Sequence, residues 1–167
     1  MARGGRLADA RTKLEQLNRV YDAKQVNEKW FRGALDAEIA LAQGDARRAA
    51  DLYTAASPDS KMPANANAPV PTSMSNDLAF PDGPARAKKA HGDLDGAIDA
   101  YRQLITPDIA SKWTLRLNPR YVLELARLYE QKGDAARARE HYRRFLDLWK
   151  NADPGLPEIA EARRKAS

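Results

Sequence analysis

Few residues of this sequence have the types and spacing that catalysis or metal binding requires. The chain of 167 residues contains two histidines, His91 and His141, and no cysteine. Neither histidine lies in an HExxH pattern, and the sequence contains no Walker phosphate loop and no dinucleotide-binding glycine pattern. His91 precedes a helix-ending glycine, where a cation is favourable, and His141 occupies an ordinary surface position of an amphipathic helix. We therefore expect no enzyme activity, no metal site and no cofactor.

A second chemical possibility is the binding of anions, because the formal net charge is +5. The 28 Lys and Arg residues are interspersed with 23 Asp and Glu residues, as the polar faces of solvated helices require. The aromatic residues nearest the densest arginines, Tyr142 and Phe145, belong to an apolar stripe and are not free to stack on bases. We therefore expect a protein or peptide partner in preference to nucleic acid. Binding of nucleic acid or an anionic surface through one arginine-rich helix face is the alternative, and it would use Arg137, Arg139, Arg143 and Arg144.

The composition predicts an all-α chain. Ala, Leu, Arg and Glu, which favour helices, are plentiful, whereas Ile and Val, which favour strands, are scarce. The absence of cysteine excludes disulfides and thiolate metal sites and fits a reducing compartment. No run of about 18 apolar residues and no secretory signal occurs, so we expect no transmembrane segment and a cytoplasmic location.

The clearest structural signal is the stretch 118–150, which predicts two amphipathic helices joined by a turn at Gly133 and Asp134. Glycine can take the left-handed conformation that ends a helix, and aspartate can cap the helix that follows. Each half carries apolar residues at helical spacing. The first stripe is Val122, Leu125, Ala126 and Tyr129, and the second is Ala138, Tyr142, Phe145, Leu146 and Trp149. Neither helix can form a core alone, so the two must face one another and then a neighbour.

The same turn occurs three times, each time within the pattern Gly-Asp-x-x-x-Ala-x-x-x-Tyr. Four identical residues at fixed offsets in three places indicate stacked structural repeats. Glycine turns the chain, alanine lets the paired helix approach closely, and tyrosine fills the gap between layers. The copies are Gly44, Asp45, Ala49 and Tyr53; then Gly92, Asp93, Ala97 and Tyr101; then Gly133, Asp134, Ala138 and Tyr142.

The other segments are predicted from periodicity and from proline content. Residues 57–84 hold six prolines, which predicts a linker or an extended strap, because proline lacks the donor that a helix needs. The connector 107–118 contains Trp113 and two leucines, so we expect it to pack against the helices. The remaining helices are expected over 6–25, 30–43, 46–56, 85–91, 94–105 and within 157–166.

These hairpins resemble the tetratricopeptide repeat family. The last copy carries Leu125, Ala126, Tyr129, Gly133, Ala138 and Tyr142 at the family's positions, and the first copy keeps Trp30, Ala37, Gly44, Ala49, Tyr53 and Ala56. The middle copy, 85–107, departs, because Pro81, Pro84 and Lys88 stand where its first helix should be apolar. The resemblance implies a single domain, 1–167, built as a solenoid of about three antiparallel helix pairs with a long proline-rich insertion. Residues 118–164 resemble the closing repeat of bacterial serine/threonine kinases and transcriptional regulators.

The resemblance also implies a partner surface on the first helix of each pair, which lines the concave face of such a solenoid. The family's version that clamps a terminal carboxylate uses lysine and asparagine where this chain has Ala34 and Glu38. That departure argues against a binder of chaperone tails. We expect an adaptor or assembly subunit of a larger complex, with partner contacts at Phe31, Ala34, Glu38 and Leu41 in the first copy and at Arg120, Leu123, Arg127 and Glu130 in the last.

Overall fold

The computed structural model describes residues 7–20, 26–56, 81–106, 118–153 and 155–167. Within these ranges the chain forms α-helices and turns and no strand, so the all-α prediction is confirmed. The helices group into two compact units, Met1–Asp93 and Leu94–Ser167, which are described one at a time.

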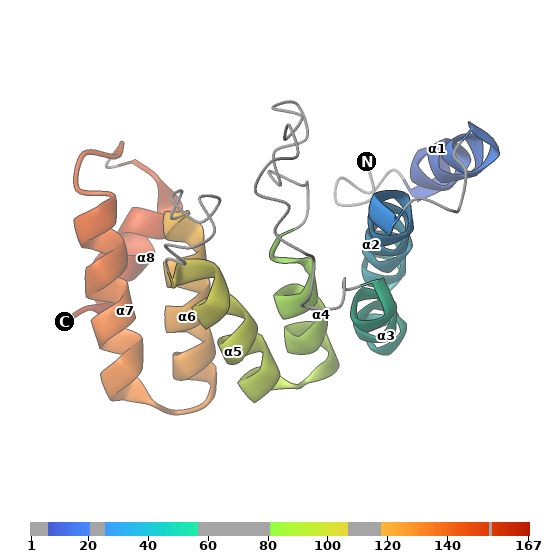
Figure 1. Ribbon diagram of the computed structural model, residues 1–167. Coiled ribbons are helices and arrows are strands. Elements are labelled where there is room, and N and C mark those ends of the chain that lie inside the picture. Colours follow the sequence, from blue (N-terminus) through green and yellow to red (C-terminus); the bar gives the residue numbers. More distant parts are fainter. Residues whose placement is uncertain (1–6, 21–25, 57–80, 107–117, 154) are drawn as a thin grey trace, which may run out of the picture. The chain divides into compact units, whose positions relative to one another are not determined.

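The first unit contains α1 (Leu7–Val20), α2 (Val26–Ala42), α3 (Ala46–Ala56) and α4 (Gly83–His91). Helix α2 packs along α3, α1 contacts α2, and α4 packs against both α3 and α2 (Figure 1). The expected helix over 46–56 is found with the same bounds, and the one expected over 30–43 begins earlier, at Val26. Of the helix expected over 6–25, the structure shows Leu7–Val20, and the residues on either side lie outside the described ranges. The first predicted hairpin is therefore present.

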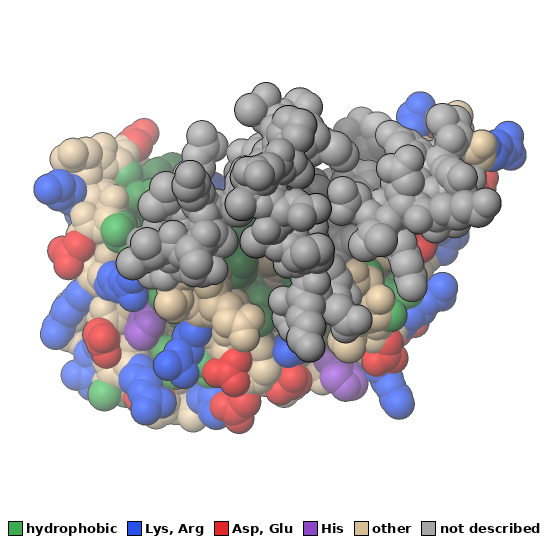
Figure 2. Space-filling model, in the orientation of Figure 1, with side chains coloured by type: hydrophobic (Ala, Val, Ile, Leu, Met, Phe, Trp, Pro, Cys, Tyr) green, Lys and Arg blue, Asp and Glu red, His purple; other side chains and the backbone are tan. Residues whose placement is uncertain are grey.

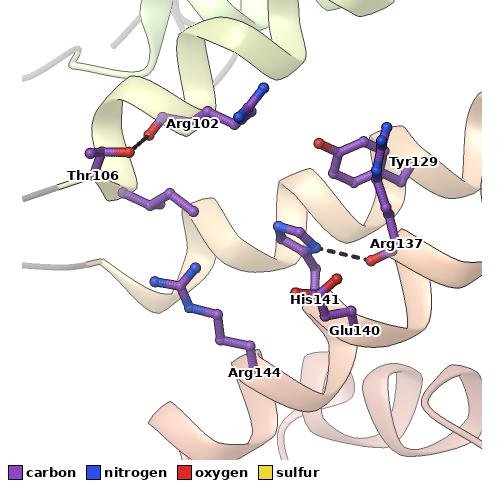
Figure 3. Close-up of a pocket in the computed structure, with 8 residues that line it drawn as sticks. Arg102, Thr106, Tyr129, Arg137, Glu140, His141 and Arg144 are labelled. Atoms are coloured by element: carbon purple, nitrogen blue, oxygen red, sulfur yellow. Dashed lines mark hydrogen bonds between the residues drawn. The ribbon is translucent and has the colours of Figure 1, made fainter.

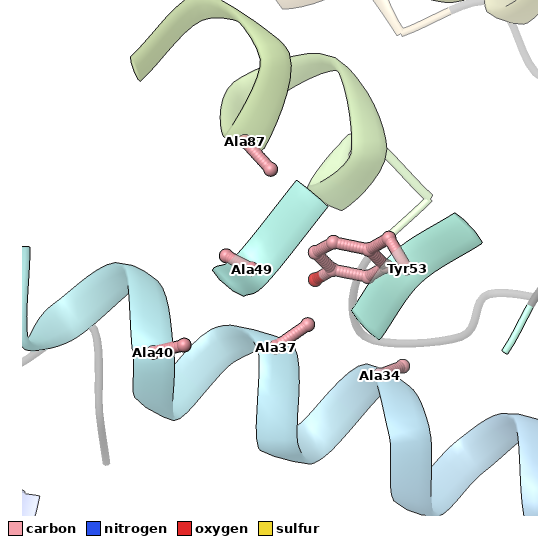
Figure 4. Close-up of a cluster of buried hydrophobic side chains, with 6 residues drawn as sticks. All are labelled: Ala34, Ala37, Ala40, Ala49, Tyr53 and Ala87. Carbon is pink, nitrogen blue, oxygen red and sulfur yellow. The ribbon is translucent and has the colours of Figure 1, made fainter. Parts of the chain in front are cut away.

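Alanines form most of the buried cluster of this unit (Figure 4). The α2 members are spaced three residues apart and so share one helical face, which lies against α3 and α4. Small side chains let the helix axes approach closely, and the ring of Tyr53 fills the space that they leave. The cluster consists of Ala34, Ala37, Ala40, Ala49, Tyr53 and Ala87.

Helix α4 begins inside the segment that we predicted as a linker. The prediction 57–84 was wrong at its end, because Gly83 and Pro84 belong to the first turn of α4. Proline is tolerated there, since its missing N–H would have no helical partner. A side chain at Gly83 would collide with the ring and hydroxyl of Tyr53, so glycine permits this close approach. The rest of the predicted linker, 57–80, and the connector up to residue 117 lie outside the described residues.

The second unit contains α5 (Leu94–Ile105), α6 (Pro119–Gln131), α7 (Ala135–Leu148) and α8 (Pro157–Lys165). Helices α6 and α7 form an antiparallel pair; α5 packs against α6, and α8 packs against α7 (Figure 1). The predicted apolar stripes are buried here, except that Leu146 and Trp149 are half-buried. The largest fully buried side chains are Tyr101, Tyr142, Phe145, Leu123, Leu125, Leu128 and Val122.

The turn motif forms as the sequence predicts. Gly44, Gly92 and Gly133 have φ angles of 83°, 92° and 81°, and no other described residue has a positive φ. The carboxylate of Asp134 accepts a hydrogen bond from the Arg137 backbone N–H at 3.0 Å, which caps α7. In all three copies the alanine and the tyrosine of the motif are buried.

Candidate protein-interaction surface

The predicted contact residues of the first unit lie on α2. Glu38 is buried, with 3% of its surface exposed, and its carboxylate accepts hydrogen bonds from the Tyr53 hydroxyl and the Arg86 guanidinium. Ala34 is fully buried in the alanine cluster, and Leu41 packs against that cluster at its edge. The side chain of Phe31 lies outside the described residues. Among the predicted contact residues of this unit whose side chains are described, Leu41 therefore offers the most accessible apolar surface.

Glu38 holds α2, α3 and α4 together. Arg86 also pairs with Asp82 through its Nε atom at 3.2 Å, so a chain of charges runs from α2 to the start of α4. A buried carboxylate is tolerated only when it is paired and hydrogen-bonded, and Glu38 meets both conditions. This role of Glu38 could not be predicted from the sequence, because the arginine that pairs with it lies 48 residues away.

The predicted contact residues of the second unit lie on α6. Leu123 is 1% exposed, so it belongs to the core and not to an open groove. The other three side chains, which are polar, reach toward α8. Arg120 lies 4.0 Å from Glu158, Arg127 pairs with Glu161, and Glu130 pairs with Lys165. The terminal helix of the chain thus contacts three of the four predicted positions.

The pair formed by Arg127 and Glu161 is bidentate. The Nε atom of Arg127 donates to one carboxylate oxygen at 3.0 Å, and its Nη2 atom donates to the other. Its Nη1 atom donates to Glu124 at 2.6 Å. Such fork-shaped pairs are among the strong charge-assisted hydrogen bonds. The hydrogen bonds to Glu161 raise the pKa of Arg127, and the same bonds lower the pKa of the Glu161 carboxyl.

Glu130 joins this network to the repeat tyrosine. Its carboxylate accepts from the Tyr142 hydroxyl at 2.9 Å and from the Lys165 ammonium at 2.6 Å. The hydrogen bond from Lys165 lowers the pKa of Glu130. Burial, and then the bond to Glu130, raise the pKa of the Tyr142 phenol. Helices α6, α7 and α8 therefore share one polar network beside the buried core.

The spacing of the charged residues on α6 and α8 matches this contact. The α6 residues Arg120, Arg127 and Glu130 share one helical face by spacing, and so do Glu158, Glu161 and Lys165 on α8. The charges on the two faces are complementary in order. Because the paired residues ascend along both helices, α6 and α8 run in the same direction. Only the fold could show that the two faces meet.

A cationic cleft lies on another side of the second unit (Figure 3). It has a volume of about 320 Å³ and is open to solvent on one side. Arg102, Ile105 and Thr106 line it from α5, Tyr129 lines it from α6, and Arg137, Glu140, His141 and Arg144 line it from α7. Sequence periodicity does not predict that α5 and α7 line one cleft, because their cleft residues are far apart in the chain.

The four arginines of the alternative function do not share one face of α7. Arg137 and Arg144 line the cleft. Arg143 instead donates to the backbone carbonyl of Ala166, beyond the end of α8, at 2.9 Å. Arg139 is two residues from Arg137 and so projects from the opposite side of the helix. On the face shown in Figure 2, basic and acidic side chains of the described residues are interspersed. The arginines of α7 therefore do not form the continuous basic track that binding of a phosphate backbone needs.

Among the described residues, no group of three or more His, Asp or Glu side chains could hold a metal ion. None of the described helices is long and apolar enough to cross a membrane.

Comparison with known families identifies the last hairpin. Residues 122–152, which contain most of α6 and all of α7, match the family model described as tetratricopeptide repeat. Searches of curated proteins and of solved structures found no significant match. The finer resemblance of residues 118–164 to bacterial kinases and regulators stays a prediction. The match and the helical hairpins together confirm the all-α, tetratricopeptide-like helical-repeat fold, and they support a protein-interaction module in general.

Proposed function

We propose that this protein is a non-catalytic adaptor or assembly subunit that binds a protein partner through its helical repeats. The observation that carries the proposal is the α6–α7 hairpin, which matches the tetratricopeptide family and has the turn, alanine and tyrosine of two earlier copies in the chain. Repeats of this kind present extended surfaces built from successive helices. A chain whose core is built from such hairpins is suited to binding a partner.

The proposed contact surface of the second unit is the edge where α6 meets α8. Arg120 is the most accessible of the predicted positions there, with 66% of its side chain exposed. Arg127 and Glu130 already pair with α8, so a partner that reaches them meets α8 at the same time. Leu123 is buried, so it stabilises the helix that carries this surface and does not contact the partner directly.

In the first unit the proposed contacts are Leu41 and Phe31 on α2. Leu41 lies at the edge of the alanine cluster, next to positions that α3 and α4 cover. Glu38 takes part through its ion pair with Arg86, which fixes the neighbouring helices in place. A partner segment that lies along α2 would therefore gain apolar contact at Leu41 without breaking the buried pair.

Affinity capture with matched variants tests the proposal. The full chain is immobilised, incubated with nuclease-treated native lysate, and compared with Arg120→Glu and Arg47→Glu. Both substitutions reverse one exposed arginine, but Arg47 lies on α3, which carries none of the proposed contacts. We expect a discrete protein that wild type and Arg47→Glu retain and that Arg120→Glu captures at less than about a third of that amount. Capture of no discrete protein by the wild type would contradict the proposed function.

A further inference from the structure

We propose that the cleft between α5, α6 and α7 binds an acidic peptide segment through its carboxylates. The inference rests on the proposed function, because it supplies the chemistry of the partner that a protein-binding chain would recognise. The cleft lies apart from the α6–α8 edge, on side chains that the predicted contact surface does not use. Its volume of about 320 Å³ is in the range of small binding sites and suits a few side chains of a partner.

Cations flank the cleft on two helices. Arg102 extends from α5 toward the side chains of α6 and α7, and Arg144 stands on α7 (Figure 3). The planar guanidinium group presents several N–H donors in a fork that matches a carboxylate. Two such groups on separate helices can hold two carboxylates of one peptide, or one carboxylate from both sides.

The ion pairs that the cleft arginines already form leave much of their positive charge available to a ligand. Arg102 lies 3.8 Å from Asp99, and Arg137 lies 3.3 Å from Asp134, and both arginines are 64% exposed in their side chains. Arg144 forms no ion pair with any residue that the structure describes. Glu140 is the one acidic side chain in the lining, against three arginines. The lining therefore attracts anions.

His141 supplies a further polar atom. Its Nδ1 atom lies 2.9 Å from the carbonyl oxygen of Arg137, and because a carbonyl only accepts, Nδ1 carries the proton. In this tautomer the Nε2 atom, on the other edge of the ring, is an acceptor, so it can accept a hydrogen bond from a backbone N–H of the bound peptide (Figure 3). The ring lies 5.1 Å from that of Tyr129, and the guanidinium of Arg137 lies 5.6 Å above the same tyrosine. These contacts hold the imidazole and one arginine in place before a ligand arrives.

Two observations favour a peptide over nucleic acid. The remaining arginines of α7 project away from the cleft, so the positive charge is a local cluster and not a track along a strand. The aromatic ring in the lining, Tyr129, is only 7% exposed and is covered by Arg137, so a base cannot stack on it. A short acidic segment needs neither a long track nor a stacking surface.

Fluorescence anisotropy with a defined probe tests the inference. The probe is a labelled, acetylated hexaglutamate peptide, and its uncharged control is hexaglutamine. The proteins are the full chain, Arg144→Glu and Arg139→Glu. The two variants carry the same charge change on the same helix, but only Arg144 lines the cleft. Circular dichroism confirms that both variants keep their helical content.

We expect hexaglutamate, and not hexaglutamine, to bind the wild type. We also expect Arg144→Glu to weaken that binding by about tenfold or more and Arg139→Glu to change it by less than about threefold. No hexaglutamate binding, or equal weakening by both variants, would overturn the inference. Tighter binding of an oligothymidylate that Arg144→Glu abolishes would overturn it in favour of nucleic acid. If lysate capture succeeds while the peptide assay fails, only the cleft inference is lost. If capture fails as well, the proposed function is lost with it.

Discussion

Arg127 on α6 and Glu161 on α8 form a bidentate ion pair that ties the terminal helix to the last tetratricopeptide-like hairpin. The same arginine also holds Glu124 on its own helix, so its side chain is fixed in one direction. Two further pairs, of Arg120 with Glu158 and of Glu130 with Lys165, join the same two helices. Helix α8 is therefore part of the contact surface that we propose.

Removal of this ion pair should loosen α8 selectively. Arg127→Met keeps the aliphatic stem but leaves the Glu161 carboxylate, which is 19% exposed, without its main cation. We expect the free energy of unfolding to fall by about 1 to 2 kcal/mol, and amide exchange of α8 to accelerate more than that of α7. Arg120→Met is the control, because its pair is long and exposed and should contribute less than about 0.5 kcal/mol. Equal effects of the two substitutions would contradict the account.

The repeat tyrosine should be a major source of stability. Tyr142 is 1% exposed, so Tyr142→Ala should lower the free energy of unfolding by about 3 to 5 kcal/mol. Tyr142→Phe removes only the hydroxyl that donates to Glu130, and should cost about 1 kcal/mol. Urea unfolding curves of the three proteins measure both values. An unchanged urea midpoint in Tyr142→Ala would rule out this packing.

Much of the fold was predictable because the repeat is local. The turn glycines, the capping aspartates and the apolar stripes each act within a few residues, so spacing alone reveals them. The short helix α4 was harder, because its start depends on Gly83 fitting against Tyr53, thirty residues earlier in the chain. A proline-rich composition hid that start, although Pro84 is compatible with the first turn of a helix.

The candidate surface was less predictable because it depends on distant pairs. Family positions on α6 placed Arg127 and Glu130 on one face, but not Glu161 and Lys165 opposite them. Leu123 was expected in a groove and is buried, because α6 has neighbours on several sides. The cationic cleft combines α5 with α7, and no sequence period links those residues.

We expect Gly133 to be required because its backbone has a positive φ, and not because a side chain there would clash with a neighbour. Gly133 has a φ of 81°, and a side chain there would meet no atom within 4 Å. Gly133→Ala should therefore cost about 1 to 2 kcal/mol, and Gly133→Asn less, since asparagine tolerates this region better. The comparison is Gly155→Ala, whose φ is not positive, with an expected change within about 1 kcal/mol. Thermal unfolding of these variants checks the prediction, and equal costs at the two glycines would refute it.

Acid should destabilise the second unit through its paired carboxylates. Glu130 and Glu161 have folded-state pKa values below the ordinary 4.5, so the unfolded chain binds protons more readily than the folded one. Their contribution to stability is complete above pH 4.5 and is lost as the pH falls through the lowered values. Glu161→Gln should therefore show a flatter decline of stability with acid below pH 4.5.

Asp147→Asn provides the control for this titration, because Asp147 is an exposed carboxylate on α7. Its stability curve should keep the wild-type acid dependence. Chemical unfolding at a series of pH values measures all three proteins. An acid dependence in Glu161→Gln as steep as that of the wild type would show that the ion pair contributes nothing.

The most direct test of the proposed interaction function is a salt titration of whatever the full chain captures from lysate, with and without nuclease. We predict a discrete protein whose capture survives nuclease treatment and falls by less than about tenfold between about 50 and 200 mM salt, since apolar contacts and a few exposed ion pairs make up such an interface. Recovery of nucleic acid whose binding falls by about a thousandfold over that range would contradict the proposal, because such a slope marks release of counterions from phosphates.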